Sequence, residues 1–146
     1  MTIRVLVADD QAMIRGALAG LLNLEHDIEV VAQAADGVQV LEELTRLTRQ
    51  NAPLDAIPTS SARPVSAVDV AIIDIEMPHM DGITTTEAIR ARFPQVRVLI
   101  VTTFGRPGYL QRALDAGATG FMVKNAPVEA LAEGVRTVAA GGRAID

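Results

Sequence analysis

Five short apolar runs recur along the chain, and stretches with the spacing of amphipathic helices separate them. The runs are rich in Val and Ile, and they cover Ile3–Ala8, Glu29–Ala32, Val68–Ile73, Val96–Val101 and Gly120–Val123. Nearly continuous apolar runs of this length are typical of parallel strands that are covered on both faces. The alternation therefore predicts an α/β fold with a five-stranded parallel sheet, doubly wound as (βα)5 with right-handed crossovers.

A helix is predicted after each strand because apolar residues recur there at helical spacing. The first four helices are indicated by Ile14–Leu22, Val40–Leu47, Ile89–Phe93 and Leu110–Leu114. The fifth runs from Val128 to Val138, with Pro127 and Glu129 at its start and Gly141 after its end. Proline and an acidic residue favour the first turn of a helix, and glycine commonly ends one.

The segment Arg49–Ala67 interrupts this alternation before the third strand. It contains three prolines and four Ser or Thr residues, without helical or alternating periodicity. Loops of a compact domain rarely exceed about 12–15 residues. We interpret the segment as an irregular surface insertion within a single domain that covers residues 1–146; a loop that binds a partner is the alternative.

The composition excludes several classes of function. The net charge is −5 without a cluster of Lys or Arg, which argues against direct binding of nucleic acid or an anionic membrane. Cysteine is absent, so the chain forms no disulfide. There is no signal-peptide pattern, and no apolar run approaches the roughly 18 residues of a membrane helix. A cytoplasmic protein without a membrane segment is therefore expected.

Chemically active side chains stand at the carboxyl ends of four predicted strands. Asp9 and Asp10 end the first, Asp74 the third, Thr102 the fourth and Lys124 the fifth. In a doubly wound sheet these ends meet at one edge, where such folds bind their ligands. We therefore expect three carboxylates, one hydroxyl and one ammonium in a single site.

The charges of this site require a further cation or a proton. Two carboxylates about 5 Å apart repel by roughly 3 kcal/mol at an effective dielectric constant of about 20. Lys124 alone does not balance three such groups, whereas Mg²⁺ is commonly held by carboxylates, water and phosphate oxygens. The sequence thus predicts a Mg²⁺ site formed by Asp9, Asp10, Asp74 and a backbone carbonyl beyond Asp74. Asp74 also has the chemistry of a nucleophile that accepts a phosphoryl group.

At this point the sequence resembles a known family. "VLVADDQ", "DIEMPHMDG", "VTTF" and "GFMVK" resemble the receiver domain of bacterial two-component response regulators, in the order and on the strands where that family has them. "TTF", "ALDAGATGFMVKNAP" and "AAGGRAID" are similar to the LuxR/NarL-type subfamily. The resemblance covers nearly the whole chain apart from the insertion, and it implies the flavodoxin-like receiver fold.

The resemblance implies a role for each matching position. Asp74 would be the phosphoacceptor, which a histidine kinase phosphorylates with the help of Mg²⁺. Asp10 would be a direct metal ligand, Asp9 would act mainly through water, and Glu76 would offer its backbone carbonyl.

Three further positions match the switch of the family. Thr102 would be the switch hydroxyl, Lys124 the phosphate-binding cation and Phe121 the switch aromatic. Such a protein is not an enzyme in the usual sense, because it catalyses only its own phosphorylation and dephosphorylation.

The resemblance also suggests the output. LuxR/NarL-type regulators usually carry a C-terminal helix-turn-helix domain, so DNA would be contacted only through a domain missing from this chain. We expect a homodimer through helices one and five, because Leu21, Leu22, Leu24 and Val138 offer more apolar surface than one helix face needs. "GRPGY" at Gly105–Tyr109 departs from a firm helix start and predicts a short or mobile helix four.

Two other classes of function fit parts of the pattern. An aspartyl-phosphate phosphohydrolase of the haloacid-dehalogenase type would combine Asp, Mg²⁺ and Lys, but it needs a second Asp where this chain has Glu76. The chain is also too short for a cap domain. A stand-alone receiver or interaction module is the other alternative, and the complete set of acids, Thr102 and Lys124 argues against a pure scaffold.

Overall fold

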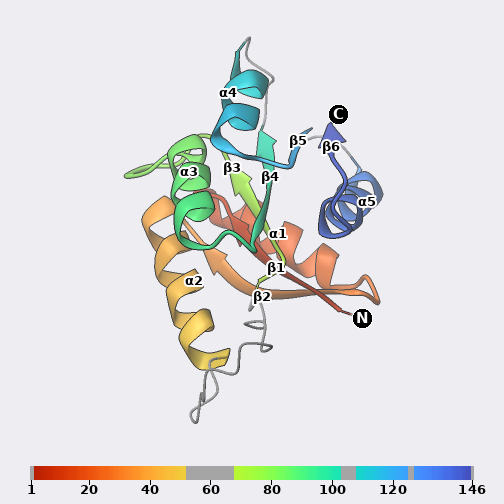
Figure 1. The fold of residues 1–146 in the computed structure, drawn as a ribbon. Helices are drawn as coiled ribbons and strands as arrows, with labels where there is room; N and C mark the ends of the chain where they lie inside the picture. The colour runs from red at the N-terminus through yellow and green to blue at the C-terminus, as the bar shows by residue number, and fades with distance from the viewer. Residues whose placement is uncertain (1, 52–67, 103–107, 125–126, 146) are drawn as a thin grey trace, which may run out of the picture.

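The computed structural model describes residues 2–51, 68–102, 108–124 and 127–145 (Figure 1). Within these residues the elements follow the order β1 (Ile3–Ala8), α1 (Ala12–Asn23), β2 (Ile28–Ala34), α2 (Gly37–Asn51), β3 (Val70–Asp74), α3 (Gly82–Arg92), β4 (Arg97–Thr102), α4 (Tyr109–Ala116), β5 (Gly120–Val123), α5 (Val128–Ala139) and β6 (Ala144–Ile145). The predicted doubly wound α/β fold is confirmed, because all five expected strands pair in parallel in one sheet.

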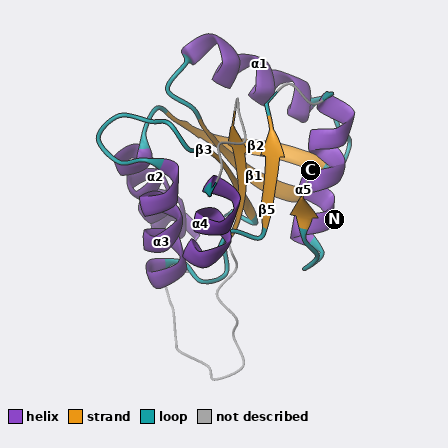
Figure 2. Ribbon diagram, turned by 90° about the horizontal axis from the view of Figure 1, so that it is seen from above, coloured by secondary structure: helices purple, strands orange, loops and turns teal. Residues whose placement is uncertain are grey.

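The strands have the order β2-β1-β3-β4-β5-β6. The chain passes from β1 to β2 on one side and then returns to place β3 on the other side of β1. This reversal creates a switch point at the carboxyl ends of β1 and β3, where doubly wound folds bind ligands. Two helices, α1 and α5, cover one face of the sheet, while α2, α3 and α4 cover the other (Figure 2).

Both faces of the sheet are packed. Val5 and Val7 of β1 face the cluster under α1 and α5, whereas Leu6 and Ala8 face the cluster under α2, α3 and α4. Successive strand residues point to opposite faces, so one apolar run supplies both cores. Full burial of an aliphatic side chain such as Leu6 contributes roughly 1.5–3 kcal/mol, and this packing fixes the strand ends that carry the site.

The structure adds detail at the end of β3, at the sheet edge beside β5 and at the start of α4. Asp74 is the last residue of β3 and not the residue after it, and β6 adds a two-residue strand beside β5 that no periodicity could indicate. The helix α4 has eight residues and begins after Gly108, which has a φ of 90° and no side chain to cap the helix. This agrees with the expected short helix four; residues 105–107 lie outside the described residues.

The predicted irregular segment needs one correction. Residues 49–51 are helical, because α2 continues to Asn51. Asn51 is the last residue of α2 that the structure describes. The remaining residues of the segment, 52–67, lie outside the described residues. Across the described ranges, no helix has the length and apolar character that crossing a membrane requires.

Candidate phosphoacceptor and metal site

The register of the sheet brings the predicted site residues together. Ala8 pairs with Ile73, so the residues that come next, Asp9 and Asp74, lie side by side at the carboxyl ends of β1 and β3. Asp74 pairs with Val101, which places Thr102 one residue further along β4. The Lys124 amide donates a hydrogen bond of 2.7 Å to the Thr102 carbonyl and extends the β4–β5 pairing by one residue.

Three carboxylates gather at this edge. One oxygen from each of Asp9, Asp10 and Asp74 lies within 4.8 Å of the others. Asp9 and Asp74 are only 1% and 5% exposed, while Asp10 is exposed. Close, buried like charges require a cation or a proton.

Lys124 supplies part of the compensating charge. Its Nζ lies 2.6 Å from Oδ2 of Asp9 and 3.1 Å from Oδ2 of Asp74. Burial acts to lower the pKa of Lys124, but the two carboxylates outweigh this effect and raise it, so the side chain is a fixed ammonium. Burial raises the pKa of Asp74, and Asp9 adds to this, while Lys124 opposes it.

Asp9 also has a structural role at the start of α1. Its Oδ1 accepts a hydrogen bond of 2.9 Å from the Gln11 amide, and its backbone carbonyl accepts one of 2.7 Å from Nη1 of Arg15. By contrast, Oδ2 of Asp9 is buried without a well-directed hydrogen bond, and within the described residues it has only the ion pair with Lys124. A buried carboxylate oxygen with lone pairs to spare, beside two more carboxylates, fits a hard divalent cation such as Mg²⁺.

Gly82 lets α3 begin directly against the phosphoacceptor strand. A Cβ at this position would collide with the carbonyl oxygen of Asp74 and lie 2.8 Å from Cα of Ile75. The Gly82 amide donates a hydrogen bond of 2.8 Å to the Ile75 carbonyl. This steric reason for the glycine depends on the packed structure and is not visible in the sequence.

The loop between β3 and α3 is tied to the start of α2. His79 has a φ of 66°, and the Met80 amide donates a hydrogen bond of 2.7 Å to the Pro78 carbonyl, which forms a strained γ-turn. Nδ1 of His79 lies 2.8 Å from Oδ2 of the buried Asp36. The Gly37 amide donates a 3.3 Å hydrogen bond to the Met80 carbonyl and closes the link.

Asp36 is a residue that the sequence analysis missed. Its Oδ1 accepts a hydrogen bond of 2.9 Å from the Gln39 amide, and this bond, followed by the His79 ring, lowers the pKa of Asp36. The sequence "DGVQ" resembles a capping box and could have indicated this helix start. Nothing in the sequence could have indicated its contact with His79, which is 43 residues away.

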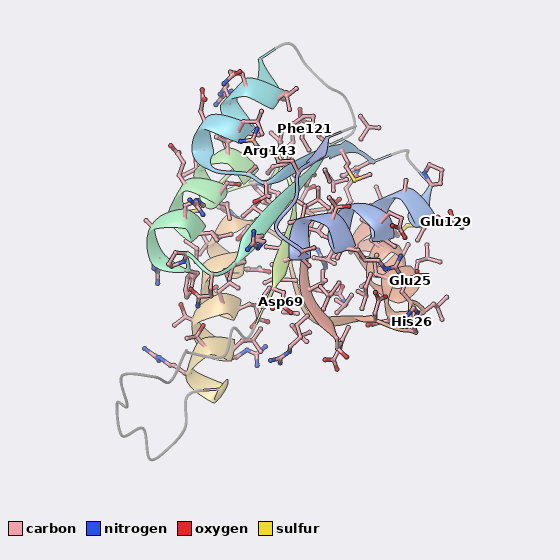
Figure 3. The ribbon with its side chains drawn as sticks, turned by 45° about the vertical axis from the view of Figure 1, so that its right-hand side comes forward. Glu25, His26, Asp69, Phe121, Glu129 and Arg143 are labelled. Atoms are coloured by element: carbon pink, nitrogen blue, oxygen red, sulfur yellow. The ribbon has the colours of Figure 1, made fainter. Side chains whose placement is uncertain are left out.

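The remaining predicted residues lie around this site. Thr102 is buried at the end of β4. Phe121 is buried on β5, with its ring in the cluster under α2, α3 and α4 (Figure 3). The Glu76 side chain is exposed, and a hydrogen bond from its backbone acts to lower the pKa of Asp74. The part of its carbonyl in binding metal stays a prediction.

The comparisons with known proteins agree with this geometry. The model of the response regulator receiver domain family matches residues 5–136. The transcriptional regulatory protein DesR of Bacillus subtilis is 37% identical over 141 residues, which cover 97% of this chain and 60% of DesR. YvfU, another transcriptional regulatory protein of Bacillus subtilis, is 36% identical over 97% of this chain and 61% of its own length.

A solved structure has the same fold. The signal receiver domain of NarL from Mycobacterium tuberculosis superposes with a TM-score of 0.79 at 28% identity, over 96% of this chain and 98% of that domain. The chain spans about 60% of the length of DesR and YvfU. These matches leave the phosphohydrolase alternative without support, and the chain belongs to the response regulator receiver domain family.

Proposed function

We propose that Asp74 accepts a phosphoryl group from a histidine kinase and that the modified domain controls a transcriptional output domain. The observation that carries this proposal is the pair of buried carboxylates, Asp9 and Asp74, that share the Lys124 ammonium beside the exposed Asp10. In a pure interaction module, an ordinary surface aspartate would not need a buried partner carboxylate and a shared lysine. The site thus has both the nucleophile and the charges that phosphoryl transfer requires.

Mg²⁺ would be held by the carboxylates of Asp9, Asp10 and Asp74 and by the Glu76 carbonyl, and when bound it would neutralise charge on the phosphoryl oxygens. The chain's own residues perform the transfer. An oxygen of Asp74 attacks phosphorus, a P–O bond forms, and the P–N bond to the donor histidine breaks. Lys124 donates hydrogen bonds to the transferred group, because its ammonium is already directed at Asp74.

The switch would link the phosphoryl group to the face of the sheet that α2, α3 and α4 cover. Thr102 follows Val101, the β4 partner of Asp74, and its hydroxyl would donate to a phosphoryl oxygen. Phe121 pairs with Ile100 on the neighbouring strand, and its ring is buried in this structure. We infer that this buried ring represents one state of the switch and that an outward position of the ring would define the other.

The output and the dimer are proposals about the whole protein. DesR and YvfU are named as transcriptional regulatory proteins, which supports a DNA-binding domain beyond this chain and a cytoplasmic location. For the homodimer we retain α1 as the central surface, because Met13 and Leu21 are exposed on it and Leu24, just after its end, is 79% exposed.

Two of the residues expected at that interface need correction. Leu22 and Val138 are fully buried in the cluster under α1 and α5, so they contribute no surface to a partner. Both residues lie on the inner faces of their helices. Spacing alone did not show this, because an error of one residue in the assumed orientation of a helix exchanges its inner and outer positions.

The experiment uses acetyl phosphate as a small phosphoryl donor. We expect intact-mass analysis to show one added phosphoryl group in the wild-type chain with Mg²⁺, and none in Asp74→Asn or after chelation of the metal. Labelling that persists in Asp74→Asn would refute the assignment. Sedimentation with beryllofluoride and Mg²⁺, compared between the wild type and Leu24→Glu, tests the dimer separately; an unchanged mass in the wild type would refute it.

A further inference from the structure

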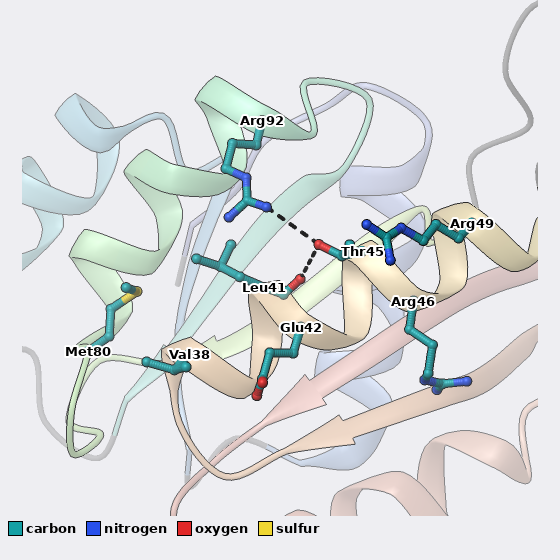
Figure 4. Close-up of a pocket in the computed structure, with 8 residues that line it drawn as sticks. All are labelled: Val38, Leu41, Glu42, Thr45, Arg46, Arg49, Met80 and Arg92. Carbon is teal, nitrogen blue, oxygen red and sulfur yellow. Dashed lines mark hydrogen bonds between the residues drawn. The ribbon is translucent and has the colours of Figure 1, made fainter.

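An open groove of about 570 Å³ runs along α2 on the face away from α1 and α5 (Figure 4). One stripe of α2 forms most of its wall, at the helical spacing i, i+3, i+4, i+7, i+8 and i+11. The α2 residues are Val38, Leu41, Glu42, Thr45, Arg46 and Arg49. Met80, from the loop after β3, and Arg92, at the end of α3, complete the groove.

One end of the groove is apolar. Val38 is 44% exposed, and Leu41 and Met80 are only partly buried. Figure 4 shows Met80 and Val38 together at the start of α2, with Leu41 further along the helix. An apolar side chain of a partner would remove these three side chains from water, at roughly 25 cal/mol per Å² of apolar surface.

The other end of the groove is basic, and contacts within the chain already hold one of its two guanidinium groups in position. Nη2 of Arg92 lies 3.5 Å from Oγ1 of Thr45, and the guanidinium lies 5.4 Å from the centre of the Phe93 ring. Arg49 is exposed and forms no hydrogen bond or ion pair within the described residues. Both guanidinium groups are therefore available to carboxylates.

Two acidic residues limit the positive charge of the groove. Arg46 is paired with Glu43 at 2.6 Å, so its charge is largely compensated within α2. Glu42 adds one negative charge near the middle of the groove. The basic end therefore rests on Arg49 and Arg92, in a chain whose net charge is −5.

We propose that this groove docks an acidic amphipathic peptide segment of a partner protein. An apolar side chain of the segment would cover Val38, Leu41 and Met80, and its carboxylates would pair with Arg49 and Arg92. From Val38 to Arg49 the helix advances about 16 Å, which suits a peptide of a few turns better than an enclosed small molecule. Nucleic acid is disfavoured by the apolar end, by Glu42 and by the net charge.

The test uses a fluorescein-labelled amphipathic helical peptide with a leucine stripe flanked by glutamates, and a second peptide in which lysine replaces every glutamate. Binding to the wild-type chain is followed by fluorescence polarisation and by amide chemical shifts. We expect saturable binding of the acidic peptide, with shifts at Val38, Leu41 and Thr45. In Arg49→Glu/Arg92→Glu the acidic peptide should bind about tenfold more weakly, and the lysine peptide should gain affinity.

Arg112→Glu is the matched control, because Arg112 is exposed on α4 and its guanidinium lies over a neighbouring aromatic ring, that of Tyr109, as Arg92 lies over Phe93. It should leave binding of the acidic peptide unchanged. Absence of saturable shifts in the groove, equal affinity for the two peptides, or an equal loss in Arg112→Glu would overturn the proposal. A change in sedimentation mass caused by the groove variants would indicate a second copy as the occupant and would also overturn it.

Discussion

Nζ of Lys124, which follows β5, lies 2.6 Å from Oδ2 of Asp9, which follows β1. The two residues are 115 positions apart by their numbers, and β3 and β4 separate their strands in the sheet. Lys124 therefore reaches across the whole site and is shared between Asp9 and Asp74. Its charge balances one of the two buried carboxylates, and the rest of the negative charge is left for a cation or a phosphoryl-bound metal to neutralise.

Removal of the Lys124 charge should destabilise the fold. In Lys124→Met, Asp9 and Asp74 stay buried without a cation, so we expect the free energy of unfolding to fall by about 3 kcal/mol without Mg²⁺. Urea denaturation measures it. The double variant Asp9→Asn/Lys124→Met should recover part of the loss, because one uncompensated charge is gone. Additive effects of the two substitutions would show that the 2.6 Å contact is energetically unimportant.

Substitution of Asp74 should have the opposite effect. Burial raises the pKa of Asp74 above the ordinary 3.8, so the folded state binds this proton more tightly than the unfolded state. The group's contribution to stability therefore falls as pH rises above 3.8 and through the raised pKa. Asp74→Asn should raise the free energy of unfolding by about 1 kcal/mol at pH 7 without Mg²⁺, and by much less at pH 3.

The control for this variant is Asp115→Asn on the exposed surface of α4, which should change stability by less than about 0.5 kcal/mol. Urea midpoints across the pH range provide the comparison. A loss of stability in Asp74→Asn at pH 7 would contradict the view that the buried carboxylates repel one another.

Mg²⁺ should stabilise the chain through the same carboxylates. At a free Mg²⁺ concentration about tenfold above its dissociation constant, linkage predicts a gain of about 1.4 kcal/mol in the free energy of unfolding. Asp10→Asn should abolish most of this gain without harming the fold, because Asp10 is exposed. The measurement is the urea midpoint with and without MgCl₂ at constant ionic strength. An equal gain in Asp10→Asn would place the ion elsewhere.

Much of this site could be predicted because its geometry follows from topology. Parallel strands end at one edge, so residues at their carboxyl ends meet whatever their separation in sequence. Asp9, Asp74 and Lys124 were found in this way. The same rule says nothing about loops, and the contact between Asp36 and His79 joins two of them through a left-handed residue that is not glycine.

Other features depended on details that periodicity does not resolve. Adjacent residues of a helix can lie on its inner and outer faces. Spacing alone therefore did not tell which of Leu21, which is exposed, and Leu22, which is buried, faces the core. The strand β6 has two residues and pairs only because α5 returns the chain to the edge of β5. Helix α2 continues beyond its last apolar residue because helix propagation does not require burial.

Arg136 should control the acid stability of the contact between α5 and the segment after α1. Its guanidinium donates to Asp27 at 2.8 and 2.9 Å and to Glu25 at 2.6 Å (Figure 3 shows Glu25 beside α5). The hydrogen bonds from Arg136 lower the pKa of Asp27 from 3.8 to about 2. A depressed carboxyl pKa stabilises the fold above 3.8, and this contribution is lost as pH falls toward about 2.

Arg136→Gln should therefore lower the unfolding midpoint most at pH values above about 4, with the difference from the wild type shrinking toward pH 2. Thermal unfolding across this range measures it. Arg143→Gln is the matched control, because Arg143 is exposed and its side chain forms no hydrogen bond or ion pair with the part of the chain that the structure describes. A difference that stays constant from pH 7 to pH 2 would mean that Arg136 acts through packing alone.

Gly82→Ala should disturb the phosphoacceptor through the backbone. The added Cβ would collide with the Asp74 carbonyl and lie 2.8 Å from Cα of Ile75, and strands packed on both faces leave the main chain no room to move. We expect a loss of about 2 kcal/mol in the free energy of unfolding and slower labelling by acetyl phosphate. Gly16→Ala, on the open face of α1 with no atom within 4 Å, should instead stabilise by about 0.5–1 kcal/mol. Unchanged stability and labelling in Gly82→Ala would show that α3 does not set the position of Asp74.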